Sequence, residues 1–372
     1  MLANQYIYFV LTSRFPTEKA YGVTTEFSAR ALEKLGYNVA IIAPVKGKTR
    51  DSNLKVEIIA SRLFNILLSR KLINFLKLRF NIFLLLYVFF MRKNLTTSNN
   101  IFWCRDIFLC FLLSLKSKSY LVCEIHRSPT SMHKFFLFIL ARKRNVILAP
   151  IANFLSDQYS LSPSRTVYAP MAINSEELVL LDKFLLSKQN KIVYVGLPHQ
   201  VGIPLNVNLI NDVAIKILNT HPNWNFELLG ISHAHLESHV LSPIAKNLTA
   251  RGFVSRNQVI EALGTASIGL VIYPDIPWFR DSFPIKIIEY AAASLAILAS
   301  DTTSHRRILD NRKCIFFDEN SLNSLNSALE KIIIDRELRQ ATARNARVWA
   351  NDYTYEKRVK SIIEVLKLNI SK

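Results

Sequence analysis

The sequence predicts an α/β fold made of two doubly wound, Rossmann-like domains that face a cleft. Short apolar runs alternate with segments of helical apolar spacing from one end of the chain to the other. The runs are apolar throughout instead of at every second residue, which is typical of parallel strands covered by helices on both faces. This series occurs twice, and turn residues and charges within 170–190 separate the two occurrences.

The first series gives the expected N-terminal domain, residues 1–175. Its predicted strands are 6–13, 37–44, 100–106, 119–126 and 145–150. A helix is expected over 24–36, because the apolar residues there have helical spacing and Gly36 provides a stop signal.

The second series gives the expected C-terminal domain, residues 176–349. Its predicted strands are 191–196, 225–230, 266–273, 295–300 and 314–318, and its clearest helices are 205–219, 256–264 and 321–334. Residues 346–372 then predict one long amphipathic helix. We expect this helix to cross back and pack on the first domain, which therefore also takes about 350–372.

The charge of the chain favours anionic partners. It has 47 Lys and Arg against 28 Asp and Glu, a net charge of +19. No acid lies between Glu57 and Asp106, and the apolar run 80–91 is shorter than the about 20 residues that span a bilayer. We expect 61–95 to bind an anionic membrane surface, with a buried helix that has a solvated basic face as the alternative. Nucleic acid is not expected, since no recognised binding motif accompanies the charge.

Several site classes are excluded by their missing motifs. The sequence has no phosphate-binding P-loop, no GxGxxG after the first strand and no GxSxG. The four cysteines lack CxxC spacing and indicate reduced core residues of a cytoplasmic protein. His233, His235 and His239 share no face of a helix or strand, so we expect no metal site.

The residues that follow the predicted strands are the first candidates for a binding site, because ligands of open α/β sheets bind at the carboxyl ends of the strands. These exits are 13–22, Arg105, Asp106, 124–127, 196–202, 230–233 and 273–286. All would converge on the cleft between the two domains.

One exit carries a distinctive pattern. Residues 283–300 are almost entirely apolar, yet they contain Lys286 and Glu289. The segment "SFPIKIIEY" followed by small residues resembles the retaining GT-B glycosyltransferases of the large group 1 family, which includes sucrose synthases and bacterial cell-envelope mannosyl- and glucosyltransferases. Those enzymes carry two Glu separated by seven residues. Here the second is Glu289, and Asp281 stands at the first position.

The resemblance implies a donor site at this segment. Ser282, Phe283 and Ile285 would place a helix N-terminus against the diphosphate, where free N–H groups favour an anion. Lys286 would add a full charge, and Glu289 would accept hydrogen bonds from the ribose hydroxyls. The alternative from the residues alone is a partly exposed ion pair between Lys286 and Glu289 at i,i+3 spacing.

Further matches extend the resemblance along most of the chain. Residues 14–44 resemble the family's opening loop and first helix, in which Gly22 would let the backbone approach a phosphate. "IFWCRD" and "LVCEIH" resemble its paired strands, with Arg105, Asp106 and Glu124 on the acceptor side and a hydrogen bond from His126 to the donor sugar. Gly252, Phe253 and Val254 would cradle the base, and "YTYEKRVKSI" looks like the closing cross-over helix.

The chain also departs from the family. After the strand 191–196 the family usually has an Arg and a Lys that neutralise the diphosphate, and 196–204 has neither. Gly196 and His199 remain candidates for donor binding there, and Arg280 would supply the missing charge. Asp281 has one methylene less than the Glu it replaces, and 169–174 lacks the expected Gly and Asp.

The resemblance implies a retaining, metal-independent transfer of a sugar from a nucleoside diphosphate sugar to a lipid-linked or saccharide acceptor, without a cofactor. The N-terminal domain would bind the acceptor and the C-terminal domain the nucleotide sugar, at the inner face of the plasma membrane in cell-envelope synthesis, for example of lipopolysaccharide or capsule. Two alternatives stay open: a nucleotide-sugar 2-epimerase with Asp106 and Glu124 as acids, and a catalytically inactive GT-B scaffold at the membrane.

Overall fold

The computed structural model describes residues 6–13, 15, 17, 20–44, 56–59, 100–115, 119–126, 131–159, 161–200, 202–236 and 246–370. The expected membrane-binding segment 61–95 and His239 lie outside these residues.

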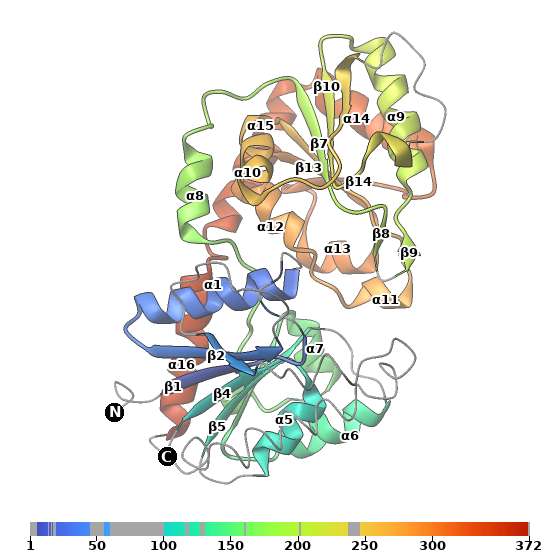
Figure 1. The fold of residues 1–372 in the computed structure, drawn as a ribbon. Coiled ribbons are helices and arrows are strands. Elements are labelled where there is room, and N and C mark those ends of the chain that lie inside the picture. Colours follow the sequence, from blue (N-terminus) through green and yellow to red (C-terminus); the bar gives the residue numbers. More distant parts are fainter. Residues whose placement is uncertain are drawn as a thin grey trace. The chain divides into compact units, whose positions relative to one another are not determined.

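The chain divides into two compact units (Figure 1). Unit 1 comprises Met1–Pro170 and Tyr355–Lys372, and unit 2 comprises Met171–Thr354. The junctions therefore fall a few residues from the positions 175 and 349 at which the sequence pattern changes.

Unit 1 contains a parallel sheet whose strands follow the order β3-β2-β1-β4-β5-β6. The strands are β1 (Tyr6–Val10), β2 (Asn38–Pro44), β3 (Val56–Ile59), β4 (Ile101–Cys104), β5 (Tyr120–Ile125) and β6 (Val146–Pro150). Tyr8 of β1 lies between Ala40 and Phe102 of its two neighbours. The side chains of β1, β4 and β6 are buried almost without exception, as the continuous apolar runs predict.

Helices cover both faces of this sheet (Figure 1). They are α1 (Ala20–Lys34), α5 (Ile107–Ser114), α6 (Ser131–Leu140), α7 (Asn153–Gln158), the 3₁₀ helix η2 (Pro163–Arg165) and α16 (Tyr355–Ile370). The C-terminal helix α16 packs on α1, and the ring of Tyr355 lies 5.4 Å from that of Phe27. The predicted return of the C-terminal helix to the first domain is confirmed.

Unit 2 repeats the same sheet topology, with the order β11-β10-β7-β12-β13-β14. Its parallel strands are β7 (Lys191–Val195), β10 (Asn225–Leu229), β11 (Leu248–Ala250), β12 (Ile268–Val271), β13 (Ala296–Ser300) and β14 (Cys314–Phe317). A small antiparallel pair, β8 (His199–Gln200) and β9 (Ile203–Pro204), follows β7.

In unit 2, α9 and α14 pack on one face of the sheet, and α10 and α12 pack on the other (Figure 1). The helices of this unit are α8 (Ser175–Asp182), α9 (Val207–Thr220), η3 (His233–His235), α10 (Arg256–Thr265), α11 (Pro277–Arg280), α12 (Ile285–Ala292), α13 (Thr303–Ile308), α14 (Leu322–Ile334) and α15 (Arg336–Ala350). Central strands and the helices α9 and α14 share one core, in which Ile192, Val213, Phe226, Leu270 and Leu329 are buried.

Both units therefore have the strand order of the Rossmann fold, with the chain reversing its direction of growth beside the first strand. In unit 1 this switch point lies between β1 and β4, and in unit 2 it lies between β7 and β12. The predicted fold class is confirmed. In each unit, the same topology predicts a crevice for ligands at the carboxyl ends of the two strands beside its switch point.

A glycine on β12 determines where α12 sits. A Cβ atom at Gly269 would lie 2.4 Å from Cδ2 of Tyr290, so only glycine lets this ring of α12 pack against the strand. The Tyr290 hydroxyl oxygen accepts a hydrogen bond from the Val195 N–H at the end of β7, at 2.8 Å. These contacts fix α12 beside the switch point of unit 2.

The single helix predicted over 346–372 is wrong. The structure has two helices, α15 and α16, separated by residues 351–354. The Tyr353 carbonyl accepts a hydrogen bond from the Ile173 N–H at 2.8 Å, and Thr354 pairs with Ile173 in an isolated bridge. This segment therefore directs its backbone to a residue remote in sequence, which an amphipathic pattern does not reveal.

Candidate active site

The N-terminus of α12 lies at the switch point of unit 2. The residue before the helix is Pro284, whose side chain offers no hydrogen-bonding group to cap it. The first N–H groups of α12 consequently have no side-chain cap, and the helix start carries the positive end of the helix dipole.

Lys286 is buried beside this helix start. Only 7% of the residue is exposed, and its Nζ makes no hydrogen bond to the described residues. Nζ lies 4.7 Å from the ring centre of Tyr194 and 4.8 Å from that of Tyr273. A Cβ at Gly196 would come within 2.8 Å of Nζ, so this glycine leaves the space that the ammonium group occupies. Burial lowers the pKa of Lys286 to about 7, although the nearby Glu289 carboxylate opposes that shift.

Glu289 does not pair with Lys286, so the ion-pair alternative is wrong. Its Oε1 accepts a hydrogen bond from Nη1 of Arg256 at 2.5 Å, and Arg256 also binds both carboxylate oxygens of Glu177 at 2.7 Å. Oε2 of Glu289 accepts no hydrogen bond from the described residues. The contact with Arg256 orients Glu289 and leaves one of its carboxylate oxygens available to a ligand.

Arg256 and Glu177 were not identified from the sequence. The Ser255 and Gln258 side chains form a capping box, and that pattern does predict a helix beginning at Arg256. It does not reveal which carboxylates the Arg256 side chain reaches, because Glu177 belongs to α8 and Glu289 to α12.

His305 is a second group that sequence reasoning missed. The ring is fully buried, and its Nδ1 lies 2.8 Å from the Ser300 carbonyl oxygen, which can only accept. Nδ1 therefore carries the proton, and Nε2 is an acceptor without a partner among the described residues. Burial lowers the pKa of His305 to about 4. The His305 ring packs edge-on against Tyr273, the same ring that Lys286 contacts.

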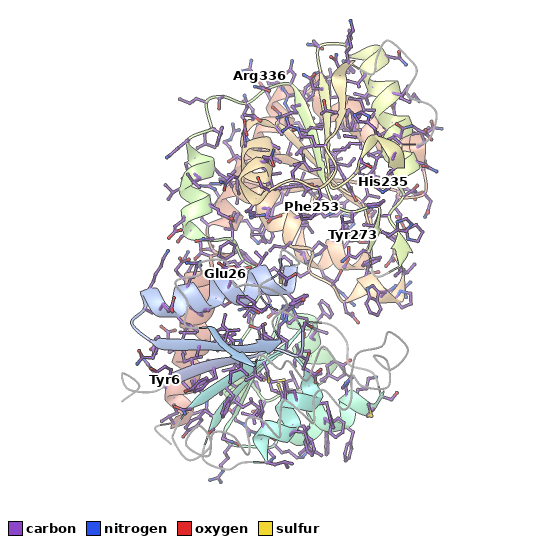
Figure 2. All side chains as sticks on the ribbon, viewed as in Figure 1. Tyr6, Glu26, His235, Phe253, Tyr273 and Arg336 are labelled. Carbon is purple, nitrogen blue, oxygen red and sulfur yellow. The ribbon has the colours of Figure 1, made fainter. Side chains whose placement is uncertain are left out.

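Backbone contacts connect the residues that follow β10 and β11 to Gly196, which lies beside Lys286. A Cβ at Gly230 would lie 2.5 Å from the Gly196 carbonyl oxygen, and the Gly230 N–H donates to the Gly252 carbonyl at 2.7 Å. Phe253, 70% exposed, and Tyr273 lie at the same edge of the sheet (Figure 2). Gly196, Gly252 and Lys286 are thus brought to one edge, with Val254 directly after Phe253.

The remaining donor-side candidates have partners of their own. Arg280 is exposed and binds Asp275 at 3.2 Å, whereas Asp281 binds Arg307 at 3.3 Å. The Ser282 hydroxyl donates to the Phe279 carbonyl at 2.7 Å. The other members of the set are an exposed His199 on β8, a buried Phe283 and a partly buried Ile285.

The switch point of unit 1 holds a buried polar network around Glu124. Its Oε1 accepts hydrogen bonds from Trp103 Nε1 and Arg358 Nη2, both at 2.7 Å. Its Oε2 lies 2.6 Å from Nε2 of His126. Burial alone would raise the pKa of Glu124, but Arg358 and His126 hold it well below its usual value.

His126 is neutral, and both of its ring nitrogens are engaged. Arg105 donates to Nδ1 at 2.7 Å, because a guanidinium can only donate. Nε2 therefore carries the proton and donates to Glu124. Burial and Arg105 lower the pKa of His126 to about 4. In this arrangement neither ring nitrogen is available for the expected hydrogen bond to a donor sugar.

Two further candidates in unit 1 have structural contacts. Asp106 caps α5, and its Oδ1 accepts from the Leu109 N–H at 2.9 Å. A Cβ at Gly22 would lie 2.3 Å from Cγ2 of Thr17, so the close approach that this glycine permits is to Thr17. A small pocket adjoins the network, lined by Phe9, Leu11, Thr24, Thr25, Trp103, Cys104, Arg105 and Glu124.

The described residues contain neither a metal-binding cluster nor a membrane-spanning helix. Among those residues, no group of three His, Cys, Asp or Glu side chains could hold a metal ion. None of the described helices combines the length and apolarity needed to cross a membrane. Of the three histidines within 233–239, His235 lies with its Nδ1 at 2.7 Å from the Ser232 hydroxyl oxygen.

Residues 182–349 match the family "Glycosyl transferases group 1". The match lies within unit 2. The glycosyl transferases group 1 match covers α9 to α14, α15 up to residue 349 and every strand of the second sheet, and it includes Lys286, Glu289 and Arg256. It supports glycosyl transfer as the activity of the chain. No curated protein matches the sequence.

Solved structures share the fold across both units. A glycosyltransferase from Rickettsia africae ESF-5 aligns with a TM-score of 0.68 and 15% identity over 99% of each chain. WaaG, a glycosyltransferase involved in lipopolysaccharide biosynthesis, has a TM-score of 0.63 and 14% identity over 97% of this chain and 99% of its own. Anabaena HepE, in complex with UDP and glucose, has a TM-score of 0.66 and 10% identity over 98% and 100%. At these identities the likeness establishes the GT-B fold.

Proposed function

We propose that the chain transfers a sugar from a nucleoside diphosphate sugar to an acceptor hydroxyl, with retention of the anomeric configuration and without a metal ion. The observation that carries the proposal is the buried Lys286 ammonium, which has no hydrogen-bonding partner in the described part of the chain and lies beside the uncapped start of α12. A buried charge without a partner is costly, and a diphosphate would supply the partner.

Lys286 and α12 would act on the leaving group. The bond between the anomeric carbon and the β-phosphate oxygen breaks, and negative charge develops on the diphosphate. The acceptor oxygen then bonds to the anomeric carbon on the face that the diphosphate leaves, and the acceptor proton passes to the departing phosphate oxygen. Because the pKa of Lys286 is about 7 without ligand, an arriving diphosphate would raise it and hold the proton on Nζ.

Glu289 and the glycine edge would hold the nucleoside. Arg256 keeps one oxygen of Glu289 occupied, so Oε2 would accept a ribose hydroxyl. The exposed Phe253, which follows Gly252, offers an apolar surface to the base. Likenesses to WaaG and to UDP-bound HepE support a cell-envelope pathway and a nucleotide-sugar donor. We place the enzyme on the inner face of the plasma membrane, with a lipid-linked or saccharide acceptor bound by unit 1.

Of the two alternatives, an inactive scaffold retains support from specific observations. Residues 196–204 lack the Arg and Lys of the family, and both nitrogens of His126 are engaged. For the epimerase, both candidate acids have structural partners. Asp106 caps α5, and Glu124 accepts hydrogen bonds from Trp103 and Arg358.

A thermal-shift screen with UDP, GDP, ADP, CMP and their common sugars tests the proposal. A ligand at 100 times its dissociation constant should stabilise the protein by about 2.7 kcal/mol. Lys286→Met should abolish the shift, whereas Lys191→Met, in a lysine paired with Glu227, should keep it. Proton NMR of the product then reports the anomer. No shift with any nucleotide would favour the scaffold, and an inverted anomer would contradict retention.

A further inference from the structure

The outward face of α6 in unit 1 is apolar. Met132, Phe135 and Phe138 are 58%, 62% and 56% exposed, whereas Leu137 and Leu140 on the inward face are buried. Leu115, which ends α5, is 59% exposed and adds to this face, since α5 packs on α6 through Phe111 and Phe136. We call Met132, Phe135, Phe138 and Leu115 the α6 surface. The outward face of a surface helix is normally polar, so two protruding phenylalanines need a reason.

Exposed basic side chains lie beside the α6 surface. Lys134, Arg142 and Arg144 are exposed beside it, and the Arg142 guanidinium lies 3.2 Å from the ring centre of Phe138. From 107 to 156 the sequence contains a single acid, Glu124, which is 2% exposed and bound to Arg358. Among the described residues, the helix therefore presents aromatic rings beside three exposed basic side chains, and the next exposed acid along the sequence is Asp157 on α7.

We infer that the α6 surface docks unit 1 on an anionic lipid bilayer. Phe135 and Phe138 would enter the boundary between headgroups and acyl chains, and Lys134, Arg142 and Arg144 would contact the lipid phosphates. A second copy of the chain is disfavoured as the occupant, because pairing two such faces would bring like charges together. The surface belongs to α6, a different segment from 61–95, and the inference does not depend on glycosyl transfer.

Co-sedimentation of the full chain with liposomes tests this docking. Wild type should bind vesicles of equal parts phosphatidylglycerol and phosphatidylcholine, and should bind pure phosphatidylcholine far less. Phe135→Ser with Phe138→Ser should weaken binding about tenfold or more, because two aromatic side chains leave the interface. Lys134→Gln with Arg142→Gln should weaken it similarly and reduce its dependence on salt.

A matched control lies in unit 2. Val179 and Leu186 are also strongly exposed apolar residues, and replacing both by serine should leave vesicle binding unchanged. The nucleotide shift should persist in all variants, so failure of docking and failure of the proposed enzyme activity are separate results.

Three results would overturn the inference. One is a serine double variant that binds vesicles as tightly as wild type. The second is a fall of several degrees in the melting temperature of that variant, which would show that another part of the chain covers the face. The third is a wild-type dimer that the double variant dissociates, since the face would then be a protein interface.

Discussion

Replacing Lys286 with methionine should stabilise unit 2 while it removes diphosphate binding. Methionine keeps an unbranched stem of similar length, so packing against the rings of Tyr194 and Tyr273 is retained. What the change removes is a buried ammonium group that makes no hydrogen bond to the described residues. Activity and stability therefore place opposite demands on this position.

The size of the effect follows from the shift in the pKa of Lys286. A fall from 10.5 to about 7 corresponds to about 4 to 5 kcal/mol of cost to the folded state when the group is protonated. Cation–π contacts with the two tyrosine rings, both within 5 Å, stabilise the ammonium group by on the order of 1 to 2 kcal/mol. We expect a net gain of about 3 kcal/mol for the methionine variant at pH 7, or roughly 6 to 12 °C in the melting temperature of a unit of this size.

The gain should depend on pH in a defined direction. Between about pH 7 and 10.5 the unfolded chain binds the Lys286 proton and the folded chain does not, so wild-type stability rises with pH there. The advantage of the methionine variant is therefore complete below pH 7 and disappears towards pH 10.5. Calorimetric melting of both proteins from pH 6 to 10 measures this difference directly.

Lys191→Met is the matched control, because Lys191 is bound to Glu227 at 2.8 Å and to the Thr265 hydroxyl at 2.6 Å. Its replacement should lower the melting temperature. The reasoning about Lys286 is refuted if its methionine variant melts at or below wild type at pH 7, or if its advantage is constant between pH 7 and 10.

Three further changes test the networks and the packing of the two units. Arg256→Leu leaves Glu289 buried without its cation, so urea unfolding should show a loss of about 3 kcal/mol in the free energy of unfolding. Nucleotide binding, measured by calorimetry, should be at least roughly tenfold weaker. Unchanged binding would show that Arg256 does not position Glu289. Arg358→Met should cost unit 1 about 3 kcal/mol at pH 7. In wild type, the lowered pKa of Glu124 contributes stability that is present above about pH 4.5 and is lost as the pH falls through the pKa of Glu124 in the folded protein. The variant should therefore lose less stability than wild type when it is titrated with acid. Gly269→Ala would place a methyl group 2.4 Å from a buried tyrosine ring of α12 and should cost about 3 kcal/mol by calorimetry; a variant that melts like wild type would show that α12 can move.

The fold could be predicted because its signals are local. A strand covered on both faces needs an apolar side chain at nearly every position, and the runs that became β1, β7 and β13 show this without any knowledge of their neighbours. The edge strands β3 and β11 were missed, since β11 is only Leu248–Ala250 and its middle residue is exposed. Short edge strands carry too little apolar pattern to stand out.

The sequence by itself determined the two Rossmann-like units and the presence of Lys286 and Glu289 after a strand, and the family resemblance implied a helix N-terminus at 283–286. Only the tertiary structure decided what those side chains contact. Arg256 reaches Glu289 from α10, and Arg358 reaches Glu124 from the last helix of the chain. Periodicity and capping depend on residues a few positions apart, whereas an ion pair depends on which helices the strand order brings together. The partners of the buried charges are therefore a property of the folded chain.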